Sequence, residues 1–421
     1  MYAPPIPFMT ASNNFLVRVV VIIACLSVGL GRPGPAATQP LAAETKSAPV
    51  TLREATAHAI ARLPDTAAYQ ALRDQVAAQR RASRGPFIGP PVVRSDVLVR
   101  SGGFTEQEAA VSAAIRWPGE GRSQRLAADR SGDAADATLD EARLIVAGDV
   151  RAAWWALALS RAIVTVERAQ IGFAETEVAQ VGRLVRAGEQ SRRDLLMAQG
   201  ERGTAQARLS VAETDLANAL SAYKALIGAP PEDFPAEAQA RQPDLDLHPL
   251  VRAASARSAA AESRAGALRF GNRPRIEASV GVRRERTDPL GDYDSALMLG
   301  VAVPLGRDPA AVAETAGARA DAIRASAEAV RVGVRLAADQ ASATRRLEIA
   351  GVALTDAQTR RNALAEALAL TTRGRREGEI GFVEYLRARQ ALSFAERDYA
   401  AARVAAAAAV SDFNQAQGVL P

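Results

Sequence analysis

The side chains that most often carry covalent or metal chemistry are scarce in this sequence. It has one cysteine, Cys25, and two histidines, His58 and His248. A single cysteine excludes a disulfide or a thiolate metal site within one chain, and two histidines form no ligand cluster. The GxSxG, phosphate-loop and HExxH signatures are missing, and no GxGxxG follows a strand pattern. The residues therefore give no argument for an enzyme, a metal or a cofactor.

Two carboxylates stand out because they occupy equivalent places in the two halves of the chain. Asp194 lies six residues after Gly188, and Glu384 lies six residues after Gly378. Each would fall in the first turn of a helix, where a negative side chain stabilises the helix dipole. These carboxylates can act through their negative charge, and the helices that carry them determine which groups that charge meets.

Those elements are two long segments without proline. Pro118 and Pro230 bound the first, and Pro309 and Pro421 bound the second; the lengths match, since 230 − 118 = 421 − 309. Alanine, leucine, arginine, glutamate and glutamine, all strong helix formers, dominate both segments. At about 1.5 Å per residue, an arm of about 65 residues reaches about 100 Å. Such segments predict helices that cross a wide space.

One turn interrupts each segment, and the two turns match. Arg186-Ala187-Gly188-Glu189 aligns with Arg376-Glu377-Gly378-Glu379. The period is close to half the chain, which predicts a duplicated domain rather than a short-repeat solenoid. Apolar residues after the first turn have the a/d spacing of a coiled coil. They are Leu209, Leu216, Leu220, Tyr223 and Ile227.

Each half also contains two segments in which apolar and polar residues alternate, near 92–100, 109–117, 275–283 and 294–303. This alternation predicts one β-hairpin in each half. A soluble sheet lying on helices explains one apolar face, and so does a membrane β-barrel with lipid outside and water inside. A barrel needs at least about eight strands. Four strands per chain would therefore require a dimer, or a trimer with 3 × 4 = 12 strands.

The N-terminus has the features of an export signal. Arg18 precedes the apolar run 19–30, which is too short for a membrane span and is followed by small residues and prolines. We expect residues 1–43 to be removed, with cleavage near Ala37 or Ala43. The run 22–25 also fits a lipobox that would make Cys25 a lipidated first residue, although the apolar run continues past Cys25.

Composition supports close-packed helices. Aromatic residues make up 5% of the chain and the net charge is +5, with arginine interleaved with acidic residues along the helical segments. That interleaving is typical of a solvated helix face and not of a nucleic-acid site. The predicted order is a signal (1–43), a first repeat (50–228), a linker (229–245) and a second repeat (246–418). The repeats hold β-hairpins at 92–117 and 274–304 and helical hairpins at 121–228 and 307–418.

Two copies of helix, β-hairpin, long helix, turn and long helix, behind an export signal, resemble the TolC-like outer-membrane efflux proteins. The resemblance covers about residues 50–418. Trp117-Pro118-Gly119 with Arg122 is most similar to the branch that serves heavy-metal cation pumps. The resemblance implies a homotrimer with a 12-stranded β-barrel in the outer membrane lipid and an α-helical barrel across the periplasm. It also implies a periplasmic adaptor and an inner-membrane pump, of the resistance-nodulation-division type, as partners.

The resemblance assigns roles to both turns. Their exposed ends would contact the adaptor, through Arg186, Gly188, Glu189, Arg376, Gly378 and Glu379. Asp194 and Glu384 would line the constricted periplasmic end, where three copies of a carboxylate favour cations. A second family carboxylate three residues later is replaced here by Met197 and Arg387. Arg387 would instead pair with an acid across the tip and hold it closed.

We therefore interpret the chain as a passive exit duct without catalytic activity, conducting metal cations or small toxic compounds supplied by a pump. A periplasmic coiled-coil adaptor is an alternative, but it would need one helical hairpin flanked by β-rich domains. A coiled-coil scaffold without a pore is the other alternative.

Overall fold

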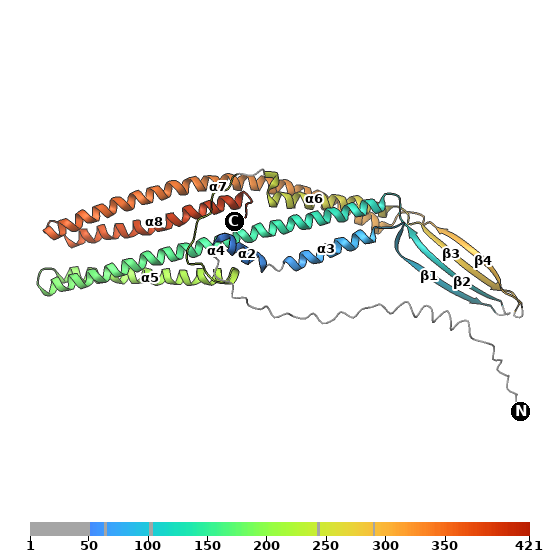
Figure 1. The fold of residues 1–421 in the computed structure, drawn as a ribbon, viewed down its shortest axis with the longest axis horizontal. Coiled ribbons are helices and arrows are strands. Elements are labelled where there is room, and N and C mark those ends of the chain that lie inside the picture. Colours follow the sequence, from blue (N-terminus) through green and yellow to red (C-terminus); the bar gives the residue numbers. More distant parts are fainter. Residues whose placement is uncertain (1–50, 63–64, 101–103, 242–244, 289–290) are drawn as a thin grey trace, which may run out of the picture. The chain divides into compact units, whose positions relative to one another are not determined.

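A computed structural model describes residues 51–62, 65–100, 104–241, 245–288 and 291–421. The predicted export signal and Cys25 lie outside these residues. Within them the chain is mainly helical with one small sheet, as the sequence predicts (Figure 1). No helix in this described part combines the length and the apolar character needed to cross a membrane.

The two halves of the chain have the same order of elements. The first half contains α2 (Leu52–Ala61), α3 (Asp65–Ala82), β1 (Phe87–Val99), β2 (Thr105–Ile115), α4 (Glu120–Arg186) and α5 (Arg192–Leu226). The second contains the short helix η1 (Leu245–Leu247), α6 (Pro249–Leu268), η2 (Arg269–Asn272), β3 (Glu277–Arg286), β4 (Asp294–Ala302), α7 (Pro309–Glu377) and α8 (Phe382–Ala416).

Two long helical hairpins dominate the fold. α4 has 67 residues and packs on α5, while α7 has 69 residues and packs on α8. The hairpins lie side by side through α4 and α8, and their turns are at the same end (Figure 1). α4 is the central helix, because α2, α3 and α6 also pack on it. The predicted seam on α5 is confirmed, with Leu209, Tyr223 and Ile227 buried.

The two β-hairpins join into one antiparallel sheet in the order β1-β2-β3-β4. Residues of one face line up across the strands, so that Val93, Val111, Val280 and Leu299 form one cross-strand row. Since β1 and β4 are the outer strands, each carries an edge of unpaired backbone groups. The strands continue into α4 and α7, which places the loops of the hairpins at the end of the sheet away from these helices.

Strand β1 begins at Phe87, earlier than the alternation at Val92 indicates. Its register with β2 shifts between Ile88 and Val92, where Pro90 and Pro91 lie. Gly89 has a φ of 73°, a left-handed conformation that favours glycine. The alternation misses this segment because prolines are tolerated at a bulge on an edge strand.

The two faces of the sheet differ in the size of their side chains. Val93, Leu297 and Leu299 on the apolar face are more than half exposed in the single chain. On the other face Gly281 lies so close to Ala109 and Ala110 that an added Cβ would be 2.8 Å from the Ala109 oxygen. A Cβ on Gly300 would lie 2.6 Å from Ser279 Oγ. Small residues on one face and large ones on the other favour a sheet that is concave on its polar side.

The core lies where the hairpin bases, α2 and the linker meet. Trp154 is fully buried and its ring contacts Phe234 of the linker edge-on, with centroids 5.3 Å apart. Arg151 is 2% exposed and donates to both carboxylate oxygens of Glu237, at 3.1 and 2.8 Å. The linker is thus anchored to α4 by an aromatic contact and a buried ion pair.

Candidate functional site

The two turns predicted to be equivalent have the same backbone geometry. Gly188 and Gly378 both adopt left-handed φ values, 78° and 82°. After each glycine a backbone N–H reaches back five residues, from Glu189 to the Leu184 oxygen and from Glu379 to the Gly374 oxygen, both at 2.9 Å. These bonds satisfy the last carbonyl groups of α4 and α7 in the manner of a Schellman motif. The chain therefore reverses in the same way twice.

All six predicted adaptor-contact residues are exposed at these turns: Arg186, Gly188, Glu189, Arg376, Gly378 and Glu379. Glu189 and Arg376 also line the cavity between the hairpins that is described below. The structure contains one chain, so it does not test the contact with an adaptor.

The predicted gate residues occupy unequal environments. The Asp194 side chain is 14% exposed, with Arg193 Nε 3.8 Å from its Oδ1, and its backbone N–H donates to the N-cap Ser191 Oγ at 3.2 Å. Glu384 and Arg387 are exposed on α8. Among the described residues, no hydrogen bond or ion pair connects these three side chains. One chain does not bring them together.

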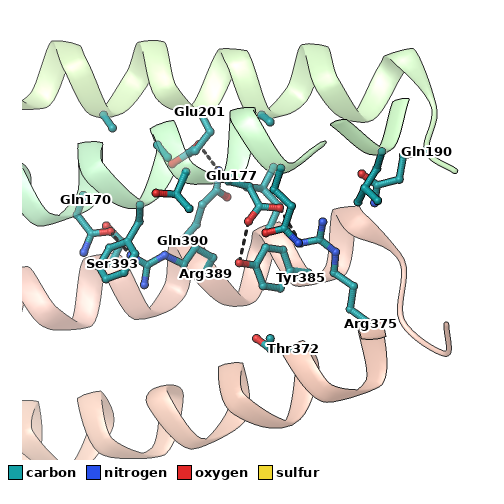
Figure 2. A pocket seen from close by; sticks show the side chains of 18 of the residues that line it. Gln170, Glu177, Gln190, Glu201, Thr372, Arg375, Tyr385, Arg389, Gln390 and Ser393 are labelled. Atoms are coloured by element: carbon teal, nitrogen blue, oxygen red, sulfur yellow. Dashed lines mark hydrogen bonds and ion pairs between the residues drawn. The ribbon is translucent and has the colours of Figure 1, made fainter. Parts of the chain in front are cut away.

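A different set of side chains connects the hairpins near the turns. Glu177 on α4 accepts from Arg375 Nη1 on α7 at 2.7 Å and from the Tyr385 hydroxyl on α8 at 3.1 Å (Figure 2). The Arg375 and Glu177 side chains are 13% and 17% exposed. The Arg375 guanidinium also lies over the Tyr385 ring, 4.3 Å from its centroid. We refer to Glu177, Arg375 and Tyr385 as the tip triad.

Burial raises the pKa of Tyr385, and the neighbouring Glu177 carboxylate raises it further. Tyr385 therefore keeps its proton at neutral pH and acts as a donor to Glu177. The triad then contains one carboxylate, one guanidinium and one neutral hydroxyl, so the charges balance within a mostly buried contact.

Further contacts extend from the triad between α8 and the two helices of the first hairpin. Arg389 donates to Gln170 Oε1 at 2.9 Å, and Gln390 donates to Glu201 of α5 at 2.7 Å (Figure 2). These side chains line a cavity of about 560 Å³ between the hairpins. On the side of the turns the contact is apolar, with Val181, Ala198, Phe382 and Leu386 clustered. The arrangement holds α8 to the first hairpin by polar and apolar contacts together.

The sequence did not identify the tip triad, because its three members come from three helices. Arg375 lies three residues before Gly378, and Tyr385 follows the predicted gate residue Glu384. The position of Arg375 and Tyr385 beside a repeated turn is the one feature of the sequence that could have indicated the tip triad. No three His, Cys, Asp or Glu side chains gather as a metal-binding group in the part of the chain that the structure describes.

Comparison with solved structures gives strong similarity at low sequence identity. The outer membrane protein VceC from Vibrio cholerae has a TM-score of 0.71 and 17% identity, covering 87% of this chain and 96% of that one. CusC, a protein described for its transmembrane channel formation, has a TM-score of 0.71 and 15% identity, covering 93% and 99%. The open MtrE outer membrane channel of Neisseria gonorrhoeae has a TM-score of 0.68 and 19% identity, covering 93% and 97%.

The chain has the TolC-like fold. No protein-family model and no curated protein matches the sequence. At these identities the similarity establishes the fold, including nearly the whole length of each channel protein. Three features of this fold bear on its function: the two exposed turns, the tip triad, and the sheet with one apolar and one polar face.

Proposed function

We propose that the chain is a subunit of a homotrimeric outer-membrane channel, the passive exit duct of a tripartite export system. The observation that supports this most is the combination of two equivalent helical hairpins with one sheet whose apolar face and both edges are uncovered. Solved outer-membrane channels are similar in fold to this chain along nearly their whole length. The cell outer membrane of a Gram-negative bacterium would hold the sheet, with the helices in the periplasm.

The sheet is suited to be one third of a barrel. The Leu299 and Leu297 side chains are 79% and 71% exposed in the single chain. Contact of such apolar surface with water is unfavourable, and contact with lipid would replace it. The uncovered edges of β1 and β4 would pair with neighbouring copies, so that three chains form a closed 12-stranded barrel. On the concave face Glu106, Glu285 and Asp294 are cross-strand neighbours. Arg283 on the same face pairs with Glu106 and lies 3.7 Å from Glu285, so this face carries charges of both signs, which suits a water-filled channel lumen.

The hairpins would form the periplasmic part of the duct. Three copies would place the exposed turns in a ring that a periplasmic adaptor can grip, through Arg186, Gly188, Glu189 and their counterparts Arg376, Gly378 and Glu379. Asp194, Glu384 and Arg387 would lie at the narrow end. An inner-membrane pump, of the resistance-nodulation-division type, would supply energy and substrate. A polar lumen fits metal cations or small toxic compounds.

Opening of the narrow end would require α8 to move relative to α4. The tip triad resists that movement, because separating the helices would break the charge-assisted hydrogen bond from Arg375 to Glu177 and the bond from the Tyr385 hydroxyl to the same carboxylate. We therefore assign the tip triad as the contact that keeps each subunit closed. Residues Asp194 and Glu384 would set ion preference, and Arg387 would pair across the subunits.

A periplasmic adaptor or a scaffold without a pore is the alternative. Two equivalent helical hairpins, and one sheet with an apolar and a polar face, fit either of these alternatives less well than they fit a duct. The alternatives make opposite predictions, since an adaptor or a scaffold needs no detergent and forms no pore. A freely soluble monomer after removal of the signal would contradict the duct.

The decisive experiment measures single-channel conductance of the detergent-purified protein in planar bilayers. Glu177→Gln should raise the open probability several-fold, because Arg375 loses its charged partner. Glu213→Gln is the matched control: it breaks the exposed Arg168–Glu213 pair (3.0 Å) within the first hairpin and should leave gating unchanged. Asp194→Asn with Glu384→Gln should lower cation preference. Equal open probability in Glu177→Gln and Glu213→Gln would contradict the role of the triad.

A further inference from the structure

The apolar face of the sheet changes character near the loops of the hairpins. Along β3, the side chains of this face are, in order, Val280, Val282, Arg284 and Arg286. The register with β2 is continuous to Arg286, and the register with β4 is continuous to Glu285. Arg284 pairs across the strands with Gln107 and Ser295. The exposed valines and leucines therefore give way to arginines on the same face.

Both arginines lie against the ring of the same tyrosine. Tyr293 immediately precedes β4, and the guanidinium carbons of Arg284 and Arg286 lie 5.1 and 5.0 Å from its ring centroid. No hydrogen bond or ion pair to either guanidinium is found among the described residues, and the Nε atoms of both lack an acceptor. The acids of this hairpin nearest in register, Glu285 and Asp294, point to the opposite face by the alternation of the strands. Both arginines thus keep unused donors beside an aromatic ring.

The position of this cluster along the strand matches the edge of a lipid layer. From Gln107, in the row of Arg284, to Ile115 at the end of β2 is 115 − 107 = 8 residues, or about 26 Å at about 3.3 Å per residue. Because barrel strands are tilted by about 40°, this length spans about 20 Å along the membrane normal, close to the apolar band about 25 Å tall that aromatic residues border. At the opposite end of the strands Trp117 and Phe270 flank Arg273, at 5.5 and 5.0 Å.

We propose that Arg284, Arg286 and Tyr293 form a site for the phosphate group of a phosphorylated lipid in the outer leaflet. The inference rests on the proposed outer-membrane location, in which the loops face away from the periplasmic helices. Guanidinium groups bind phosphate oxygens with two parallel hydrogen bonds. Two arginines held at one tyrosine supply a pre-oriented pair of such donors at headgroup depth. Three copies of the chain give three equivalent sites around the barrel.

The experiment uses the full mature protein, purified in detergent and mixed with diphosphoryl lipid A or its dephosphorylated form, with bound lipid counted by native mass spectrometry. Wild type should retain the phosphorylated lipid, and Arg284→Gln with Arg286→Gln should lower its affinity about tenfold or more. The matched control is Arg94→Gln with Arg283→Gln, which removes the same charge from the other face and should retain the lipid.

Equal retention of both lipids by wild type, or equal loss in the two double variants, would overturn the site. Displacement of the lipid by inorganic phosphate at the same concentration would also overturn it, since the site would then bind a free anion. Conductance of the same preparations keeps the two proposals apart. Pores without selective lipid retention would contradict this site alone, whereas selective retention without pores would contradict the duct alone.

Discussion

The two helical hairpins share their lengths and their turns, but they bury different surfaces. Gly188 and Gly378 are 190 residues apart, and applying this offset to Arg151, Trp154 and Trp155 of α4 gives Ala341, Thr344 and Arg345 of α7. The three residues of α4 are buried, and those of α7 are exposed. The first hairpin is the centre on which α2, α6 and the linker pack, although α6 also packs on α7. The second hairpin has the same length without a core of this kind at the equivalent positions.

The outer face of α7 shows what the second hairpin has instead. It carries apolar side chains at helical spacing that nothing in the single chain covers. These are Ile323, Val330, Val334, Ile349 and Val352, each more than 60% exposed. The comparison teaches that a repeated backbone can serve two purposes: one hairpin forms an internal core, and the other presents an uncovered apolar face that the proposed trimer would use for contact between copies.

The largest effect is expected from removing the core residue that only the first hairpin has. Trp154→Ala should lower the free energy of unfolding by about 3–5 kcal/mol, because a fully buried ring in contact with Phe234 is replaced by a cavity. Thr344→Ala, at the equivalent place in α7, should change it by less than about 0.5 kcal/mol. Denaturant unfolding measures both, and similar losses would show that the two hairpins do not differ in this way.

A smaller effect, on assembly rather than folding, is expected on α7. Val334→Glu should leave the helical content of each chain unchanged and shift the protein from trimer toward monomer, since a charge would enter the surface between copies. Val334→Ala at the same site should keep the trimer. Light scattering in detergent gives the mass of the assembly. A stable Val334→Glu trimer would mean that this face of α7 is not covered by another copy.

The smallest effect concerns the N-terminal caps of α2 and α6, which differ between the two halves. Thr51 and Glu54 form a capping box at α2, with both bonds at 3.3 Å, whereas α6 is capped by His248, whose Nδ1 accepts from the Leu250 N–H at 3.2 Å. Burial lowers the pKa of His248. The folded state therefore favours the neutral imidazole. The free energy of unfolding that the neutral His248 contributes is present in full above about pH 6.5 and is lost as the pH falls below that value.

His248→Asn should remove that pH dependence, because an asparagine caps a helix without titrating. Near pH 7.5 the free energy of unfolding of the variant should differ from that of wild type by about 1 kcal/mol or less. Below pH 6 the stability of the variant should depend less on pH than that of wild type. Thermal unfolding from pH 5 to 7.5 tests this, with Thr51→Ala as a control whose loss is independent of pH. Parallel pH profiles of wild type and His248→Asn would contradict it.

Local patterns allowed much of this fold to be predicted from the sequence. The alternating strands, the proline-free helices and the glycine turns each depend on residues close together in the chain, and the repeat made each pattern visible twice. The tip triad could not be predicted, because Glu177, Arg375 and Tyr385 meet only after two hairpins pack. The unequal burial of Asp194 and Glu384 has the same origin, since equivalent sequence positions face different neighbours.

The start of β1 has a consequence for how copies of the chain can join. Pro90 and Pro91 have no N–H group to donate, so an uninterrupted run of backbone donors along this edge begins only at Val92. The remainder of β1, Val92 to Val99, nearly equals β4, Asp294 to Ala302, in length. In the proposed trimer a neighbouring β4 would therefore slide little along β1, and this pair of prolines would limit the stagger between subunits.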